Sequence, residues 1–334
     1  MSLEIRKFNP ETPDVIVVDG LWGSGKSLIA PIVASLRGVG GYRIDPNVEY
    51  LTTLRTLGKI DQDAYGFLVL NGFILGHYHN VIGREVNLRT KDDSSVFKNG
   101  AGFRTLMKLP SVGGDSALAE AQRRHSAYFL MTHLLTSVAP TLMGVAEGKV
   151  RLINIRRNPL FMVDHWANYL ATFERSREAT LSISWEGSKV PWFAAEWAGE
   201  FLEATILERS LLGIARCAAA ERLALAKLGD NRDPVLSMRF DSVLTDPSGT
   251  VLALEEFLGR SATHLTGTQL RKLRLGPGRL PIHRAPKKRP DLSGMVRKDL
   301  AERYRAQARS SVWDEFFDCV EDYERRPNYT GGSD

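Results

Sequence analysis

The 334-residue chain has few cysteines and no long uninterrupted hydrophobic run. Its two cysteines, Cys217 and Cys319, are too few for a disulfide-built secreted scaffold or a structural zinc site made of cysteines. Residues 1–7 contain no apolar run of the kind that forms the core of a signal peptide, and the polar stretch 9–13 follows them. This predicts that no signal peptide is present. The most apolar stretch, residues 128–146, contains His133 and Pro140, so we expect a buried helix there rather than a membrane span. These absences predict a soluble cytoplasmic protein.

The composition is that of a folded globular protein. Lys and Arg number 44 against 39 Asp and Glu, for a formal net charge of +5, and 43% of the residues are hydrophobic. Such values exclude intrinsic disorder, collagen and coiled coil. At about 150 residues per domain, the length permits two domains or one large one. We predict a single α/β domain over residues 1–334, with insertions at about 50–140 and 174–230.

Four short runs of apolar and β-branched residues predict strands, each followed by a probable helix. The runs cover residues 14–19, 42–45, 150–155 and 235–240. Strands separated by long helical segments form a mostly parallel sheet with helices on both faces.

Two further segments have the composition of long helices, and two have no clear period. We expect covering helices over residues 115–135 and 196–227, and functional loops or small insertions over residues 84–114 and 174–192.

A glycine-rich loop follows the first predicted strand and precedes a helical pattern. Residues 20–27 read Gly-Leu-Trp-Gly-Ser-Gly-Lys-Ser, which fits G-x-x-x-x-G-K-[ST] in its required context. The glycines let backbone N–H groups converge on phosphate oxygens at a helix N-terminus, and a lysine adds positive charge. The sequence therefore predicts a P-loop fold; the alternative is a glycine-rich turn with a solvated lysine. The predicted nucleotide contacts are Gly20, Trp22 (near a base or acceptor), Gly23, Ser24, Gly25, Lys26 and Ser27, the last a Mg²⁺ ligand if a triphosphate is bound.

The loop alone does not choose the chemistry, because kinases, GTPases, ATPases and sulfuryl-transfer enzymes share it. A motor or switch NTPase needs an acidic residue at the end of a second apolar strand to arrange Mg²⁺. The strand at 150–155 is followed by Arg156 and Arg157, and only Asp45 is a fair candidate for that acid. An ATP-hydrolysing motor is therefore disfavoured.

Two later segments resemble the sulfotransferase family. Arg157-Asn158-Pro159 follows an apolar strand and precedes a helix, as in the family's motif for the 3′-phosphate of the sulfuryl donor PAPS. The segment from Arg239-Phe240-Asp241 through Asp246-Pro247 to Phe257-Leu258-Gly259 is similar to a second family motif. The resemblance covers residues 14–36 and 150–280. It departs from the family in the loop, where Gly23 stands in place of the family lysine and Lys26-Ser27 in place of hydroxyl residues, as in a kinase.

The resemblance implies transfer of a sulfuryl group from PAPS to a hydroxyl of a small molecule or saccharide. The loop with Lys26 would hold the 5′ phosphates, and Arg157 the 3′-phosphate. The family's 3′-phosphate serine falls on His165, which we take with Lys26 as a catalytic candidate. Without the resemblance, Arg157 can also pair with a surface acid, and Arg239 with Asp241 or Asp246.

A basic segment over residues 271–290 contains eight Lys and Arg and no acid. Its glycines and prolines predict irregular structure. We predict a flexible, lid-like segment that closes over a polyphosphate or an anionic acceptor; the alternatives are a solvated loop and a nonspecific nucleic-acid patch. Residues 271–278 loosely resemble the sulfotransferase family's basic loop over the 3′-phosphate of the donor, and the resemblance implies that Arg271, Lys272 and Arg274 contact that phosphate. No nucleic-acid-reading motif is present, so nucleic acid is not the expected partner.

Transfer to a hydroxyl needs a base, and only geometry can select it. The candidates are His77, His79, His125, His133, His165, Asp45 and Glu49. The leading hypothesis is a sulfotransferase-like transferase that uses PAPS. One alternative is a kinase that uses ATP and Mg²⁺, and the other is a nucleotide- or nucleic-acid-binding protein without catalysis.

Overall fold

The four predicted strands belong to one six-stranded sheet in the order β2-β3-β1-β4-β7-β8, of which only β8 is antiparallel to its neighbour. This computed structural model describes residues 5, 11–84, 87–90, 95, 114–173, 181–229, 234–273, 294–327 and 329–330. The strands of the sheet are β1 (Val15–Asp19), β2 (Arg43–Ile44), β3 (Tyr128–Met131), β4 (Val150–Arg156), β7 (Val235–Arg239) and β8 (Tyr329–Thr330).

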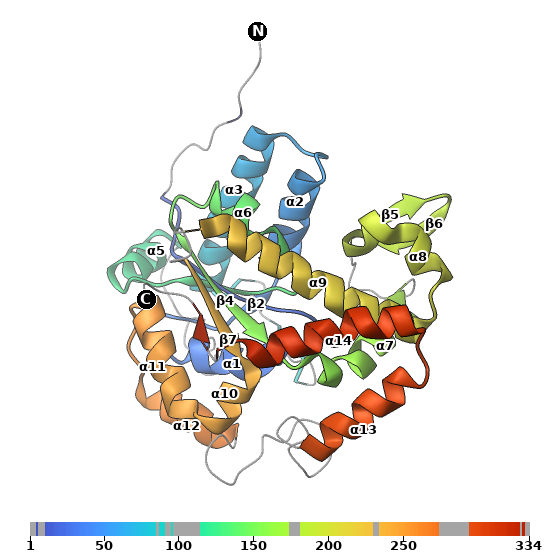
Figure 1. Ribbon diagram of the computed structural model, residues 1–334. Coiled ribbons are helices and arrows are strands. Elements are labelled where there is room, and N and C mark those ends of the chain that lie inside the picture. The colour runs from blue at the N-terminus through green and yellow to red at the C-terminus, as the bar shows by residue number, and fades with distance from the viewer. Residues whose placement is uncertain are drawn as a thin grey trace.

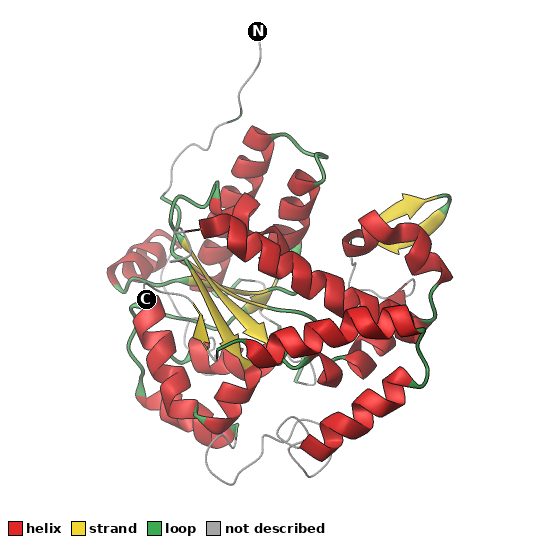
Figure 2. Ribbon diagram, in the orientation of Figure 1, coloured by secondary structure: helices red, strands yellow, loops and turns green. Residues whose placement is uncertain are grey.

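Helices cover both faces of this sheet (Figures 1 and 2). Alternate residues of β1 enter different cores, because successive side chains of a strand point to opposite faces. Val15 and Val17 pack with one set of helices, and Ile16 and Val18 with the other. The first set is α2 (Asn47–Thr56), α3 (Gln62–Val81), α6 (Ala139–Met143), α7 (Val163–Ala171), α9 (Ile206–Leu228), α13 (Gly294–Arg305) and α14 (Ser310–Arg325). The second is α1 (Lys26–Ala34), α10 (Phe240–Thr245), α11 (Pro247–Leu258) and α12 (His264–Lys272). This arrangement confirms the predicted α/β fold class.

The prediction of helix through residues 128–135 was wrong. Helix α5 (Gly114–Arg123) ends early, and Tyr128–Met131 form strand β3, which pairs with β1. All four residues of β3 are buried, two against each core. A short run that is apolar on both faces has the same pattern in a buried strand as in a buried helix, so periodicity could not separate them.

One other prediction needs correction, and another is made more specific. The expected helix over 196–227 is two helices, α8 (Ala198–Glu203) and α9, because Thr205 and Glu208 form a capping box that starts a new helix. Of the two options predicted for residues 174–192, a functional loop or a small insertion, the described part fits the second, because it contains a hairpin of β5 (Ser182–Trp185) and β6 (Ser188–Pro191). Among the described residues, no helix is long and apolar enough to cross a membrane.

Candidate phosphate-binding site

The glycine-rich loop lies where the motif requires it, between the carboxyl end of β1 and the first turn of α1. Gly25 precedes the helix with a φ of 97°, and a Cβ on this residue would overlap the ring of Phe240. Gly20 has a φ of 141°, and a Cβ there would overlap the carbonyl oxygen of Ile155. Glycine is therefore required at both positions by the backbone angle and by the close approach of a neighbour.

Replacing Gly25 by alanine tests this packing against a matched control. Gly58 also has a positive φ, 67°, but a Cβ there meets no atom within 4 Å. Gly58→Ala is expected to cost about 1–2 kcal/mol for the left-handed backbone alone. Gly25→Ala is expected to cost about 1–3 kcal/mol more, because the ring of Phe240 must move. Urea unfolding measures both, and equal losses would show that the contact with Phe240 places no constraint on the loop.

Lys26 is almost fully buried at the start of α1. Its Nζ donates hydrogen bonds to the carbonyl oxygens of Gly20 and Leu21, the second at 3.0 Å. Burial lowers the pKa of Lys26 to about 8, against the opposing charges of Asp19, Glu49 and Glu221. The ammonium is thus held against the glycine-rich loop, as predicted. Because it is poorly solvated there, a nearby anion would stabilise its positive charge.

Arg157 and His165 also come to the loop. Arg157 Nη1 donates to the carbonyl oxygen of Gly23 at 2.8 Å, and its guanidinium lies 5.0 Å from the ring centroid of Phe240. A Cβ on Gly23 would lie 3.3 Å from the side chain of His165, which is exposed on α7. Although the residue as a whole is exposed, partial desolvation of its ring, then the charges of Lys26 and Arg157, lower the pKa of His165. The alternative pairing of Arg239 with Asp241 is what the structure shows, since Arg239 Nη2 lies 3.0 Å from Asp241 Oδ2 and both side chains are largely buried.

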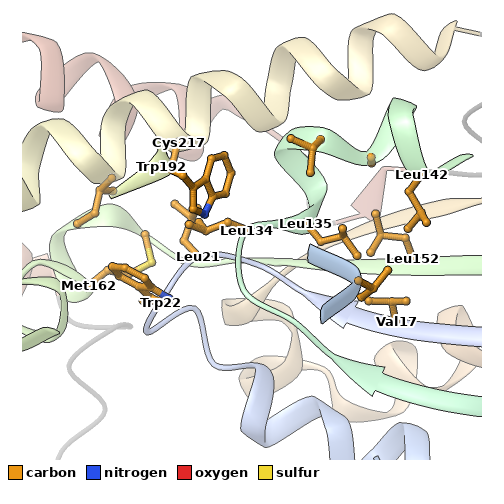
Figure 3. Close-up of a cluster of buried hydrophobic side chains, with 14 of the residues drawn as sticks. Val17, Leu21, Trp22, Leu134, Leu135, Leu142, Leu152, Met162, Trp192 and Cys217 are labelled. Carbon is orange, nitrogen blue, oxygen red and sulfur yellow. The ribbon is translucent and has the colours of Figure 1, made fainter. Parts of the chain in front are cut away.

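The other predicted contacts differ in where the structure places them. Ser24 is buried and Ser27 is exposed. The indole of Trp22 lies in the core with Trp166, Tyr169 and Phe193 (Figure 3 shows Trp22 with Met162 in this cluster), so the expected stacking on a base or acceptor is replaced by core packing. Arg271 and Lys272 are in the last turn of α12 rather than in an irregular segment, and Arg274 and the rest of the segment to 290 lie outside the described residues.

Strand β3, which the sequence analysis missed, brings two candidate bases to the loop. It ends beside β1, and the next residues are Thr132 and His133. The backbone N–H groups of His133 and Leu134 donate to Glu49 Oε2 at 3.0 and 3.3 Å, which ties α2 to this turn. Burial, then the charge of Asp19, raise the pKa of Glu49 to about 7. Burial, then the charges of Lys26 and His165, lower the pKa of His133 to about 3, so its ring is neutral at pH 7.

The remaining sequence candidates lie on other elements of the fold. His77 and His79 are on α3, and His125 follows α5. Asp45 follows β2, which β3 separates from β1, and its Oδ1 accepts from the N–H of Asn47 at 2.9 Å. The carboxylate proposed to arrange Mg²⁺ therefore helps to start α2.

Two buried acids that sequence reasoning did not weigh flank the loop. Asp19, the last residue of β1, accepts hydrogen bonds from the hydroxyl groups of Thr132 and Thr136. Glu221 on α9 is 6% exposed, and Asn154 Nδ2 lies 3.4 Å from its Oε2. Burial, then the charge of Asp19, raise the pKa of Glu221 to about 8. Asp19 directly precedes the glycine-rich motif, so the sequence could have indicated it. The position of Glu221 beside the loop depends on how α9 crosses the sheet, which the sequence does not indicate.

Comparison with solved structures finds sulfotransferase-fold proteins of low identity. A sulfotransferase domain from the curacin biosynthetic pathway is 10% identical, with 94% of this chain and 98% of that one covered and a TM-score of 0.47. A sulfotransferase domain from the Synechococcus PCC 7002 olefin synthase is 11% identical, with 97% and 100% covered and a TM-score of 0.40. Retinol dehydratase in complex with androsterone and the inactive cofactor PAP is 18% identical, with 95% and 84% covered and a TM-score of 0.42.

No protein-family model and no curated protein matches this chain. Likeness at these TM-scores assigns no activity to it.

Proposed function

We propose that the protein is a transferase that moves a sulfuryl group from PAPS to a hydroxyl of a small molecule or saccharide. The observation that carries the proposal is the contact of Arg157 with Gly23. It sets a second cation beside a phosphate loop that already holds Lys26. A donor with phosphates on both its 5′ and 3′ positions has two anionic groups to match two such cations, whereas ADP has phosphates at one end.

The described residues fit such a donor. The loop glycines leave room for close backbone approach, and the buried hydroxyl of Ser24 has no hydrogen-bond partner among the described residues. Lys26 and the loop N–H groups would hold the 5′ side, and Arg157 with His165 the 3′-phosphate. Arg271, Lys272 and Arg274 remain proposed contacts of the same phosphate. When bound, the donor supplies an activated sulfuryl group on its 5′-phosphate.

His133 is the residue we assign to the acceptor proton. In the transfer, the acceptor oxygen forms a bond to sulfur, the bond from sulfur to the 5′-phosphate oxygen breaks, and adenosine 3′,5′-bisphosphate leaves. The proton of the acceptor hydroxyl goes to the neutral ring of His133, which is half-buried and therefore reachable. Glu49 is buried, holds the backbone of this turn, and acts as a positioning residue.

Calorimetric titration tests the donor class. The protein is titrated with adenosine 3′,5′-bisphosphate and, separately, with ADP and Mg²⁺. We expect tighter binding of the bisphosphate and a loss of at least about tenfold in Arg157→Ala, since a buried charge-assisted contact contributes about 1.5–3 kcal/mol. Arg84→Ala, which removes an arginine of another loop, is the control and should change neither affinity. Tighter binding of Mg²⁺-ADP, unchanged in Arg157→Ala, would contradict the proposal.

A kinase is the second candidate, and the intact Gly25-Lys26-Ser27 favours it, with Ser27 exposed at the start of α1. Against it, the strand beside β1 is followed by Thr132 and His133, where triphosphate-using P-loop enzymes need an acid for Mg²⁺. Transfer that survives EDTA supports the sulfuryl reaction, and transfer abolished by EDTA and restored by Mg²⁺ supports the kinase.

A further inference from the structure

A pocket lies next to the loop and shares Ser24 and Arg157 with the proposed donor site. It is enclosed by the carboxyl end of β4, helices α9 and α14, and Leu21 and Ser24 of the loop. The two helices cross over this part of the sheet in Figure 1. The lining is apolar in part, with Met162, Ala218 and Leu225 among its residues.

The same lining holds buried polar atoms that have no hydrogen-bond partner among the described residues. They are Ser24 Oγ, Asn154 Oδ1, Glu221 Oε1, and Nε and Nη1 of Arg156. Ser24, Asn154 and Glu221 are each at least nine-tenths buried. Buried polar groups are normally paired, and each one left alone costs about 1–3 kcal/mol. A concentration of such atoms on one pocket indicates a polar ligand.

The charges of the lining favour an anion. Arg156 donates from Nη2 to the carbonyl oxygen of Pro327 at 3.2 Å, while two other nitrogens of this cation, Nε and Nη1, have no acceptor among the described residues. Arg222 and Arg326 also line the pocket, and both pair with Asp322 at 3.4 and 2.9 Å. The other acid is Glu221, whose pKa of about 8 keeps it largely protonated at pH 7, so that it offers an O–H donor rather than a negative charge.

We propose that this pocket binds one small oxyanion, at a place adjoining the phosphate loop's own site, through Arg156 and Glu221. The chemical class is a free carboxylate, sulfate or phosphate. Such an ion supplies several acceptor oxygens at once, which the unpaired N–H and O–H groups require.

Titration of two pocket variants tests the site. Both are made in the Lys26→Met protein, so that the loop ammonium contributes nothing to ion binding. Sodium sulfate, phosphate and acetate are titrated by calorimetry at constant ionic strength, with sodium chloride as the control. We expect one ion to bind per chain, and the tightest of the three identifies its class. Arg156→Gln should weaken that binding at least about tenfold, because it removes a charge-assisted donor.

Ala218→Leu fills the pocket without removing a charge, and it should weaken binding to a similar extent while the protein stays folded by circular dichroism. This second variant keeps the test decisive if Arg156→Gln does not fold. Heats no larger than those of chloride, or binding that Ala218→Leu leaves unchanged, would overturn the proposal. The titrations use neither donor nor acceptor, so they do not depend on sulfuryl transfer.

Discussion

Lys26→Met is expected to lower kcat for transfer from PAPS by about 10²–10³-fold, the usual cost of removing one charge that stabilises a transition state. The ammonium is held on the loop by the carbonyl oxygens of Gly20 and Leu21, and it is poorly solvated. Negative charge that develops between the sulfuryl group and the 5′-phosphate therefore meets a buried cation. The release of adenosine 3′,5′-bisphosphate, with a panel of phenol, alcohol and saccharide acceptors, measures the loss.

The same variant should not lose stability, because burying the ammonium opposes folding: its pKa falls from 10.5 to about 8. We expect the free energy of unfolding in urea to stay equal or to rise. A variant that is inactive and also clearly less stable would show that Lys26 serves the fold rather than the transfer.

The pH dependence of kcat/KM gives an independent readout, because it reports the free enzyme. As the pH rises through about 8, Lys26 loses its proton and its charge, so kcat/KM should fall by about tenfold per pH unit above that value. The residual activity of Lys26→Met should lack this decline. A wild-type profile that is flat from pH 7 to 10 would contradict the assignment.

His133→Gln is expected to lower kcat by about 10²–10⁴-fold, the range for loss of a general base. The substitution leaves the backbone N–H of residue 133, which donates to Glu49, so the turn after β3 keeps its anchor. In the unsubstituted protein, the ring of His133 is neutral at pH 7 because burial and the charge of Lys26 lower its pKa to about 3. A bound donor would offset the charge of Lys26, which raises the basicity of the ring when the acceptor arrives.

His165→Gln is the matched control for this substitution. His165 lies against Gly23, on the side of the loop where Arg157 binds. We therefore expect this variant to raise KM for PAPS more than it lowers kcat. If His165→Gln lowers kcat as strongly as His133→Gln is expected to, and His133→Gln does not, the two histidines have exchanged roles.

Two features of the candidate site, strand β3 and the buried Glu221, were not predicted from the sequence. Residues 14–19 were predicted as a strand because they form a β-branched apolar run that a glycine-rich turn follows at once, and the structure has a strand over Val15–Asp19. Residues 128–131 have no such turn, and an apolar run buried on both faces has no period to read. Because β3 was not predicted, the sequence analysis could not show that His133 directly follows a strand that pairs with β1. Glu221 sits in an ordinary helical pattern, in which nothing distinguishes it from the other charged residues of the predicted helix over 196–227.

By itself, the sequence determined the phosphate loop, its strand and helix, and the α/β class, because these depend on glycines, charges and apolar runs that are close together along the chain. Only the tertiary structure decided which histidine and which acids stand beside Lys26. His133 follows β3, Glu49 is on α2 and Glu221 is on α9. Each of the two acids is more than 80 residues from His133 along the chain. The order of strands in the sheet and the crossing of α9 bring them together, and spacing along the chain does not encode either.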